Sequence, residues 1–256
     1  MSQFDNQYAA SSASTHRGAF NAGLRSYMLG VYNYMTLGVA LTGAVAYIIY
    51  TMMVTTDASQ AVVTLKGGTM LTQLGYLLMI SPLKWVVMLM PLLFILVMSF
   101  ARMSAANAQI VFWAFATVMG VSMSSIFVVF NLGSIFQIFF LSAAAFASLS
   151  LYGYTTKKDL SGLGSFLIMG LVGLFLASIV NMFLQASALQ FAISVIGVLV
   201  FAGLTAYDTQ RIKDEYFMVA GDREATAHAS IFGALTLYLD FVNMFMMLLN
   251  LLGDRE

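Results

Sequence analysis

Two aspartates stand out because each interrupts a stretch that is otherwise apolar. Asp240 lies in the middle of residues 233–252, a hydrophobic stretch long enough to cross a bilayer. Asp208 lies at the end of the preceding hydrophobic stretch. A bare carboxylate in hydrocarbon costs at least a few kcal/mol, so a buried one must be protonated, paired or in contact with water. We therefore expect these two residues to carry much of the function.

Two carboxyl groups at hydrogen-bond distance would have a definite chemistry. In a medium of low dielectric constant they do not both ionise easily, so Asp208 and Asp240 would share one proton. The shared proton would latch the two segments together, and either gaining or losing a proton would break the latch. The ionised pair would also be a hard oxygen site suited to Ca²⁺. Contact between the two aspartates would therefore link protonation to cation binding.

A basic residue on another hydrophobic stretch is a possible partner for the pair. Arg102 follows the stretch 85–101 and would reach Asp208 if their two helices are neighbours, which one sequence does not reveal. Arg102 can instead extend to lipid headgroups from the end of its helix. Asp208 can instead form a local ion pair with Arg211, one helical turn further on. Both alternatives remain open at this point.

Polar side chains follow one face of the stretch 233–252. Thr236, Asp240, Asn243 and Asn250 are separated by four, three and seven residues, spacings that return to the same face of a helix. A polar face inside a helix bundle indicates an aqueous path or a network of interhelical hydrogen bonds. We therefore expect Thr236 and Asn243 to line the surroundings of Asp240.

The composition indicates that these residues lie in a multi-pass membrane protein. Hydrophobic residues make up 61% of the chain and charged residues only 9%, whereas a soluble domain carries about 25% charged residues. We predict an all-α bundle at 27–256 with seven membrane-spanning helices, preceded by a disordered polar tail at 1–26. The predicted loops include 54–84, with a short apolar part, and the charged segment 213–226. The predicted spans are 28–53, 85–101, 107–130, 135–155, 163–184, 190–212 and 228–252.

The distribution of basic residues predicts the orientation of the bundle. Cytoplasmic loops carry an excess of Lys and Arg. A cytoplasmic N-terminus places eight of the 11 basic residues in inner segments and three in outer ones. An odd number of spans then places the C-terminus outside, whereas a re-entrant seventh segment would place both ends inside. The inner residues are Arg17, Arg25, Arg102, Lys157, Lys158, Arg211, Lys213 and Arg223.

Three motifs resemble the Bax inhibitor, or transmembrane Bax inhibitor motif, family. They are LTAYDTQRIK at 204–213, LYLDFVN at 237–243 and RSYMLGVYNYM at 25–35, the last similar to the bacterial branch. The resemblance covers nearly the whole chain after the tail. It implies a central seventh helix with six helices around it, in the plasma membrane of a bacterium.

The resemblance also implies a function. Family members are pH-sensitive calcium leaks gated by an aspartate pair, which Asp208 and Asp240 match, while Arg102 matches the basic residue that can pair with the former. Some members carry a glutamate within the second helix, but residues 86–98 contain no acid, so the ion path here is expected to differ. An alternative function, suggested by resemblance to certain bacterial members, is to bind and modulate a membrane-bound protease.

Other classes of function find little support in the chain. The net charge of zero gives no sign of a nucleic-acid partner. The absence of cysteine excludes disulfides and thiolate metal sites, and both histidines lie outside the predicted membrane interior. We therefore expect no enzymatic activity and no cofactor, with Ca²⁺ as a transported ion and the lipid bilayer and Ca²⁺ as the partners.

Overall fold

Seven long helices form the body of the protein, as the hydrophobic stretches predict. The structure is a computed structural model that describes residues 2–65, 67–101 and 103–255, with side chains from residue 20 onward. Within these residues, seven helices are long and apolar enough to cross a membrane. The fold is therefore that of an all-α multi-pass membrane protein. The candidate spans are Phe20–Met53, Leu83–Phe100, Ala105–Val129, Leu132–Thr155, Ser161–Leu184, Ser187–Val219 and Arg223–Leu252.

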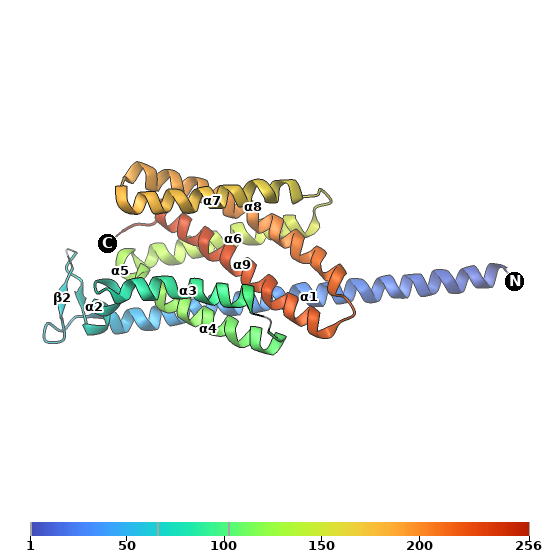
Figure 1. Ribbon diagram of the computed structural model, residues 1–256, viewed down its shortest axis with the longest axis horizontal. Helices are drawn as coiled ribbons and strands as arrows, with labels where there is room; N and C mark the ends of the chain where they lie inside the picture. The colour runs from blue at the N-terminus through green and yellow to red at the C-terminus, as the bar shows by residue number, and fades with distance from the viewer. Residues whose placement is uncertain (1, 66, 102, 256) are drawn as a thin grey trace.

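The last helix, α9 (Arg223–Leu252), is the centre of the bundle. In its most apolar stretch 67% of the residues are buried, against at most 39% in any other span. It contacts α1 (Ser2–Met53), α4 (Ala105–Met123), α6 (Leu132–Thr155) and α8 (Ser187–Val219). In Figure 1 it crosses the molecule between α6 and α8 on one side and α1, α3 (Leu83–Phe100) and α4 on the other. The predicted central position of the seventh span is confirmed.

The first helix includes the segment that we predict to be a tail. Helix α1 begins at Ser2, and its first part projects away from the bundle (Figure 1). An alanine-rich segment without proline is compatible with helix, in place of the predicted disorder. Packing against the bundle includes Phe20, whose ring lies 5.2 Å from that of Tyr216 on α8. Contacts with the bundle thus begin before residue 26, the boundary that polar composition indicates.

The segment between the first two spans holds more structure than the predicted loop. Three short strands, β1 (Val54–Thr55), β2 (Val63–Thr64) and β3 (Met70–Leu71), form an antiparallel sheet in the order β1-β3-β2. Helix α2 (Gln73–Met79) follows, in the short apolar part of the predicted loop, and packs on α1 and α3. Strands of two residues leave almost no periodic pattern in a sequence, which is why the sheet was not predicted.

The charged segment 213–226 is mostly helical, which corrects the predicted loop. Helix α8 continues to Val219, and α9 begins at Arg223 after a turn in which Gly221 has a φ of +105°. The Asp222 side chain caps α9 by accepting hydrogen bonds from the backbone N–H groups of Glu224 and Ala225. Charged side chains end a hydrophobic stretch but do not end a helix, so α8 extends beyond its apolar part.

The two termini lie at opposite ends of the bundle (Figure 1). Helix α9 runs unbroken for 30 residues, so the seventh span is not a re-entrant segment. The residues after it bind the turn between α5 (Ile126–Val129) and α6. The carbonyl oxygen of Asp254 accepts from the N–H of Asn131, and its own N–H donates to Ser134 Oγ. An N-terminus in the cytoplasm would therefore place the C-terminus outside, although the orientation itself stays a prediction.

Candidate functional site

Helices α8 and α9 bring the two aspartates together. The helices are joined by the short turn 220–222, so they pack against each other in opposite directions. Helix α6 supports α8 at this level through Gly153. A Cβ atom at that position would overlap the backbone carbonyl of Ala206, two residues before Asp208. Glycine thus lets α6 approach α8 closely enough to enclose Asp208.

The two carboxyl groups are buried and lie close enough to interact. Asp208 is 6% exposed and Asp240 is 5% exposed. Two carboxyl groups form a hydrogen bond with each other only when one of them holds a proton, because an ionised carboxylate has nothing to donate. Within the described part of the chain, Oδ2 of Asp240 has no hydrogen-bond partner. A buried oxygen without a donor is costly, and few native residues keep one.

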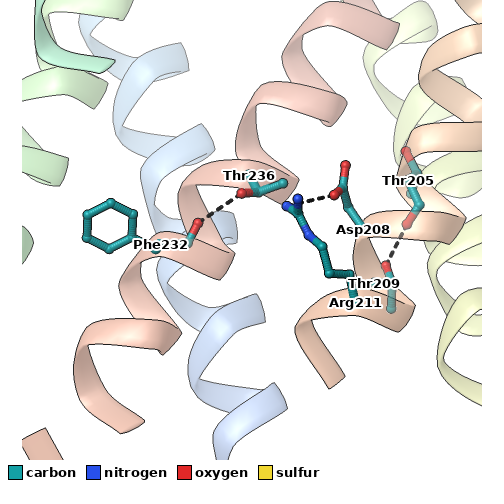
Figure 2. A network of polar contacts seen from close by, with 6 residues as sticks. All are labelled: Thr205, Asp208, Thr209, Arg211, Phe232 and Thr236. Atoms are coloured by element: carbon teal, nitrogen blue, oxygen red, sulfur yellow. Dashed lines mark hydrogen bonds and ion pairs between the residues drawn. The ribbon is translucent and has the colours of Figure 1, made fainter. Parts of the chain in front are cut away.

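Among the described residues, one cation forms an ion pair with the carboxyl groups. The guanidinium Nη2 of Arg211 lies 2.8 Å from Oδ1 of Asp208, within α8 (Figure 2). The Arg211 side chain is 50% exposed, and its guanidinium lies over the ring of Tyr207 at 5.8 Å from the ring centroid. Asp208 thus has a cationic partner that also faces outward. Asp240, deeper in the bundle, forms no ion pair with any residue that the structure describes.

A polar cleft leads to this arginine. The cleft has a volume of about 690 Å³ and lies between the start of α7 (Ser161–Leu184), α8 and α9. Arg211, Asp214 and Glu215 line it from α8, and Thr236 lines it from α9. Asp208 and Asp240 are not among its lining residues. Arg211 therefore stands between the cleft and the buried carboxyl pair, in contact with both.

The polar stripe of α9 divides into two parts. Thr236 lines the cleft, and its hydroxyl donates to the carbonyl oxygen of Phe232 (3.1 Å; Figure 2). Asn243 lies one turn beyond Asp240, and its Nδ2 donates to the carbonyl oxygen of Leu239 at 2.8 Å. It is not among the cleft-lining residues. Thr236 and Asn243 thus bond within α9, and the predicted lining role of Asn243 stays a prediction.

The predicted partner of the gate, Arg102, lies outside the residues that the structure describes. Its ion pair with Asp208 therefore stays a prediction. The partner of Asp208 within the described residues is Arg211, the local alternative that the sequence left open.

A chain of hydroxyl groups that sequence reasoning missed lies beside Asp208. Thr209 Oγ1 donates to the carbonyl oxygen of Thr205 (2.7 Å; Figure 2), so it accepts from Ser150 Oγ at 2.9 Å. Ser150 in turn accepts from the Tyr32 hydroxyl at 2.7 Å. The chain links α1, α6 and α8 in one direction. Its members come from three distant parts of the sequence, and no local spacing connects them.

The site offers few ligands for a resident metal. In the searched residues, no group of three or more His, Cys, Asp or Glu side chains could hold a metal ion. Ca²⁺ in proteins takes about six to eight oxygen ligands. Asp208 and Asp240 supply two carboxyl groups, which suits a brief contact with a passing cation better than a closed binding site.

Comparison with known proteins finds one family and several bacterial relatives that match almost the whole chain. The family described as "Inhibitor of apoptosis-promoting Bax1" matches residues 24–256. A protein of Caulobacter vibrioides is 43% identical over the full length of both chains. The inner membrane protein YbhL of Escherichia coli is 41% identical over 92% of this chain and 94% of its own. A protein of Rickettsia prowazekii is 43% identical over 93% of each chain.

Proposed function

This chain belongs to the Bax inhibitor-1 family, and on that premise we propose that it is a proton-regulated calcium leak gated by Asp208 and Asp240. A similar protein of Escherichia coli is named an inner membrane protein, and we assign this chain to the bacterial inner membrane. The observation that supports the proposal is the burial of two carboxyl groups, close enough to interact, on adjacent helices. The bilayer and Ca²⁺ are its partners, and Ca²⁺ is cargo.

The shared proton acts as a latch between α8 and α9. With one proton, Asp208 and Asp240 attract each other through a hydrogen bond across the helix interface. With no proton, two negative charges repel each other in a medium of low dielectric constant. With two protons, the ion pair between Asp208 and Arg211 is lost. Only the singly protonated state therefore keeps both the bond between Asp208 and Asp240 and the ion pair with Arg211. The two carboxyl groups thus titrate as one unit.

Arg211 couples this latch to water. Its half-exposed guanidinium lines the polar cleft and also binds Asp208. When Arg211 moves into the cleft, Asp208 loses its counter-charge and the carboxyl pair becomes accessible. Arg102 is proposed as a second cation that competes for Asp208. Exchange between cationic partners would give the closed and open states different ion pairs at the same carboxylate.

The acids at the cleft attract the transported cation. Asp214 and Glu215 line the cleft on the same helix as Asp208. Carboxylates at the mouth of a pore raise the local concentration of cations and favour them over anions. Because residues 86–98 of α3 contain no acid, we assign the entry of Ca²⁺ to this cleft between α7, α8 and α9.

The test is calcium flux into proteoliposomes as a function of pH. Asp208→Asn and Asp240→Asn keep the size and polarity of each side chain but remove the shared titration. Both variants should conduct with a flattened pH response. Asp159→Asn is the matched control. Asp159 lies outside the spans, and hydrogen bonds from the Ser161 side chain and N–H lower the pKa of its carboxyl. Wild-type pH dependence in both site variants would refute the gating role.

A second candidate function rests on the part of α1 that projects beyond the bundle (Figure 1). A projecting helix is a suitable surface for a membrane protease, and we keep modulation of such a protease as the alternative. Deleting residues 2–18 removes this surface and leaves the bundle contact of Phe20 in place. If the deletion leaves association with the protease and its turnover of substrate intact, this alternative is wrong.

A further inference from the structure

A second large cavity lies on the other side of α9. Its lining is mainly apolar, unlike that of the polar cleft. It has a volume of about 780 Å³ and lies between α1 and α6, with Phe241 of α9 among its lining residues. This volume falls within the range of about 300–1,000 Å³ that is usual for small-molecule sites. The side chains of Leu29 and Leu151 line it and are 51% and 61% exposed. The cavity is therefore a groove between two membrane helices, with exposed apolar side chains among its walls.

The walls of the groove offer almost no hydrogen bonds to an occupant. Phe139 and Phe146 line it from α6, and both pack edge-on against Phe241. The polar side chains Tyr32 and Ser150 also line it, but they bond to each other at 2.7 Å. With these hydroxyl groups already paired, the middle of the groove favours a hydrocarbon over a polar ligand.

One end of the groove is cationic. Arg25 lines it at the start of the membrane part of α1, and no carboxylate in the described residues forms an ion pair with Arg25. Tyr154 lines the same groove from the end of α6. A second cation, Lys213, lies near this end without lining the groove: its Nζ donates to the carbonyl oxygen of Tyr154 at 3.1 Å. The groove thus joins an apolar body to a basic end, which matches an amphiphile with an anionic head.

The length of the groove matches one leaflet of a bilayer. Its lining residues on α1 run from Arg25 to Ala40, which is roughly 22 Å along a helix with a rise of about 1.5 Å per residue. One leaflet, including its headgroup region, is half of a bilayer that is about 40–45 Å thick. A single acyl chain therefore fits along the groove when its headgroup is at Arg25.

We propose that the groove between α1 and α6 binds one acyl chain of an anionic phospholipid, whose headgroup phosphate contacts Arg25. The bilayer supplies the ligand. A lipid in the groove is bound at a defined site, whereas the other lipids around the bundle are not. The bound chain lies against Phe241, next to Asp240 in the sequence of α9. This site is independent of the proposed calcium leak, because it involves neither the carboxyl pair nor the polar cleft.

The test is lipid retention by the full chain in detergent, followed by native mass spectrometry. The delipidated protein is titrated with dioleoyl phosphatidylglycerol or with dioleoyl phosphatidylcholine, which has the same chains and no net charge. The anionic lipid should bind more tightly. Arg25→Gln should lower its affinity about fivefold, the effect of one basic residue near an anionic headgroup. Arg25→Lys should retain most of the preference. Arg223→Gln, which removes a cation outside the groove at the same end of the bundle, should change nothing.

A second variant tests the apolar part of the same site. Ala147 lines the groove and is exposed, so Ala147→Trp fills the groove without disturbing the core. This variant should weaken binding of both lipids about equally, whereas Arg25→Gln should weaken binding of phosphatidylglycerol more than that of phosphatidylcholine, whose choline cation offsets its phosphate. Excess inorganic phosphate should not displace the lipid. Equal retention of both lipids by the wild type, or unchanged binding in both Arg25→Gln and Ala147→Trp, would overturn the proposal.

Discussion

Helix α9 buries two polar side chains two residues apart, and their surroundings are opposite in character. Tyr238 is fully buried, and its hydroxyl bonds Thr42 Oγ1 at 2.7 Å. Thr42 donates onward to the carbonyl oxygen of Ala116 at 2.8 Å, so Tyr238 is the donor in the first bond. The ring of Phe115 packs edge-on against Tyr238. At Asp240, by contrast, a buried oxygen has no partner among the described residues.

The difference separates a structural contact from a responsive one. Around Tyr238 every hydroxyl hydrogen has an acceptor. This face of α9 therefore joins α1, α4 and α9 into a rigid unit. Around Asp240 the number of hydrogen bonds depends on how many protons the pair holds. A buried polar group with complete partners stabilises one arrangement of helices, whereas one with incomplete partners lets the arrangement respond to pH.

The largest expected effect is on the pH response of calcium flux, and it distinguishes the Asp240 face of α9 from the Tyr238 face. Asp240→Asn should make calcium flux into proteoliposomes independent of pH, because the shared proton can no longer be gained or lost. Tyr238→Phe, on the opposite face of α9, should leave the pH response unchanged. If both variants lose the response, it arises from the packing of α9 as a whole and the comparison between its two faces fails.

The next effect concerns the stability of the Tyr238 face. Thr42→Val keeps the shape of the side chain but leaves the buried Tyr238 hydroxyl without its acceptor and removes the extra bond to the Ala116 carbonyl. Leaving buried polar groups unpaired should cost about 1–3 kcal/mol. Thermal unfolding in detergent should show a lower midpoint, with the pH response of the flux retained. An unchanged midpoint would mean that this junction does not hold the bundle together.

A smaller effect sharpens the description of the Asp240 face. Arg211→Gln removes the cation next to Asp208, and a protonated pair is then favoured. The midpoint of the flux response should move to higher pH by about one unit. Arg211→Lys keeps the charge and should largely keep the midpoint. A midpoint that stays in place in the Gln variant would indicate that another cation, such as Arg102, neutralises Asp208.

The smallest effect is expected on the thermal stability of Tyr238→Phe, the variant that also serves as the control for Asp240→Asn. Tyr238→Phe removes one hydrogen bond, while Thr42 still donates to Ala116. Hydrogen bonds between membrane helices contribute about 0.6 kcal/mol on average. The midpoint of thermal unfolding should therefore fall less than in Thr42→Val. A loss as large as that of Thr42→Val would contradict the assignment of Tyr238 as the donor.

Much of the fold was predictable because hydrocarbon imposes a length and a composition on every span. The break between the predicted spans 107–130 and 135–155 is confirmed, and there Asn131 caps α6 by accepting from the N–H of Gly133. The extension of α8 to Val219 was not predicted, since charge was taken as the end of the helix. The sheet after α1 was also missed, because its strands are too short to show a period.

By itself the sequence determined that two carboxyl groups must find an unusual environment, because a charge in hydrocarbon is costly wherever the chain places it. The central position of α9 was implied by the resemblance to a known family and not by the residues alone. Only the tertiary structure decided which groups meet. Arg211 binds Asp208 from one turn away, Gly153 lets α6 close over α8, and Asp240 keeps an oxygen that has no partner among the described residues. These facts depend on which helix faces are neighbours, and periodicity within one helix carries no information about the face opposite.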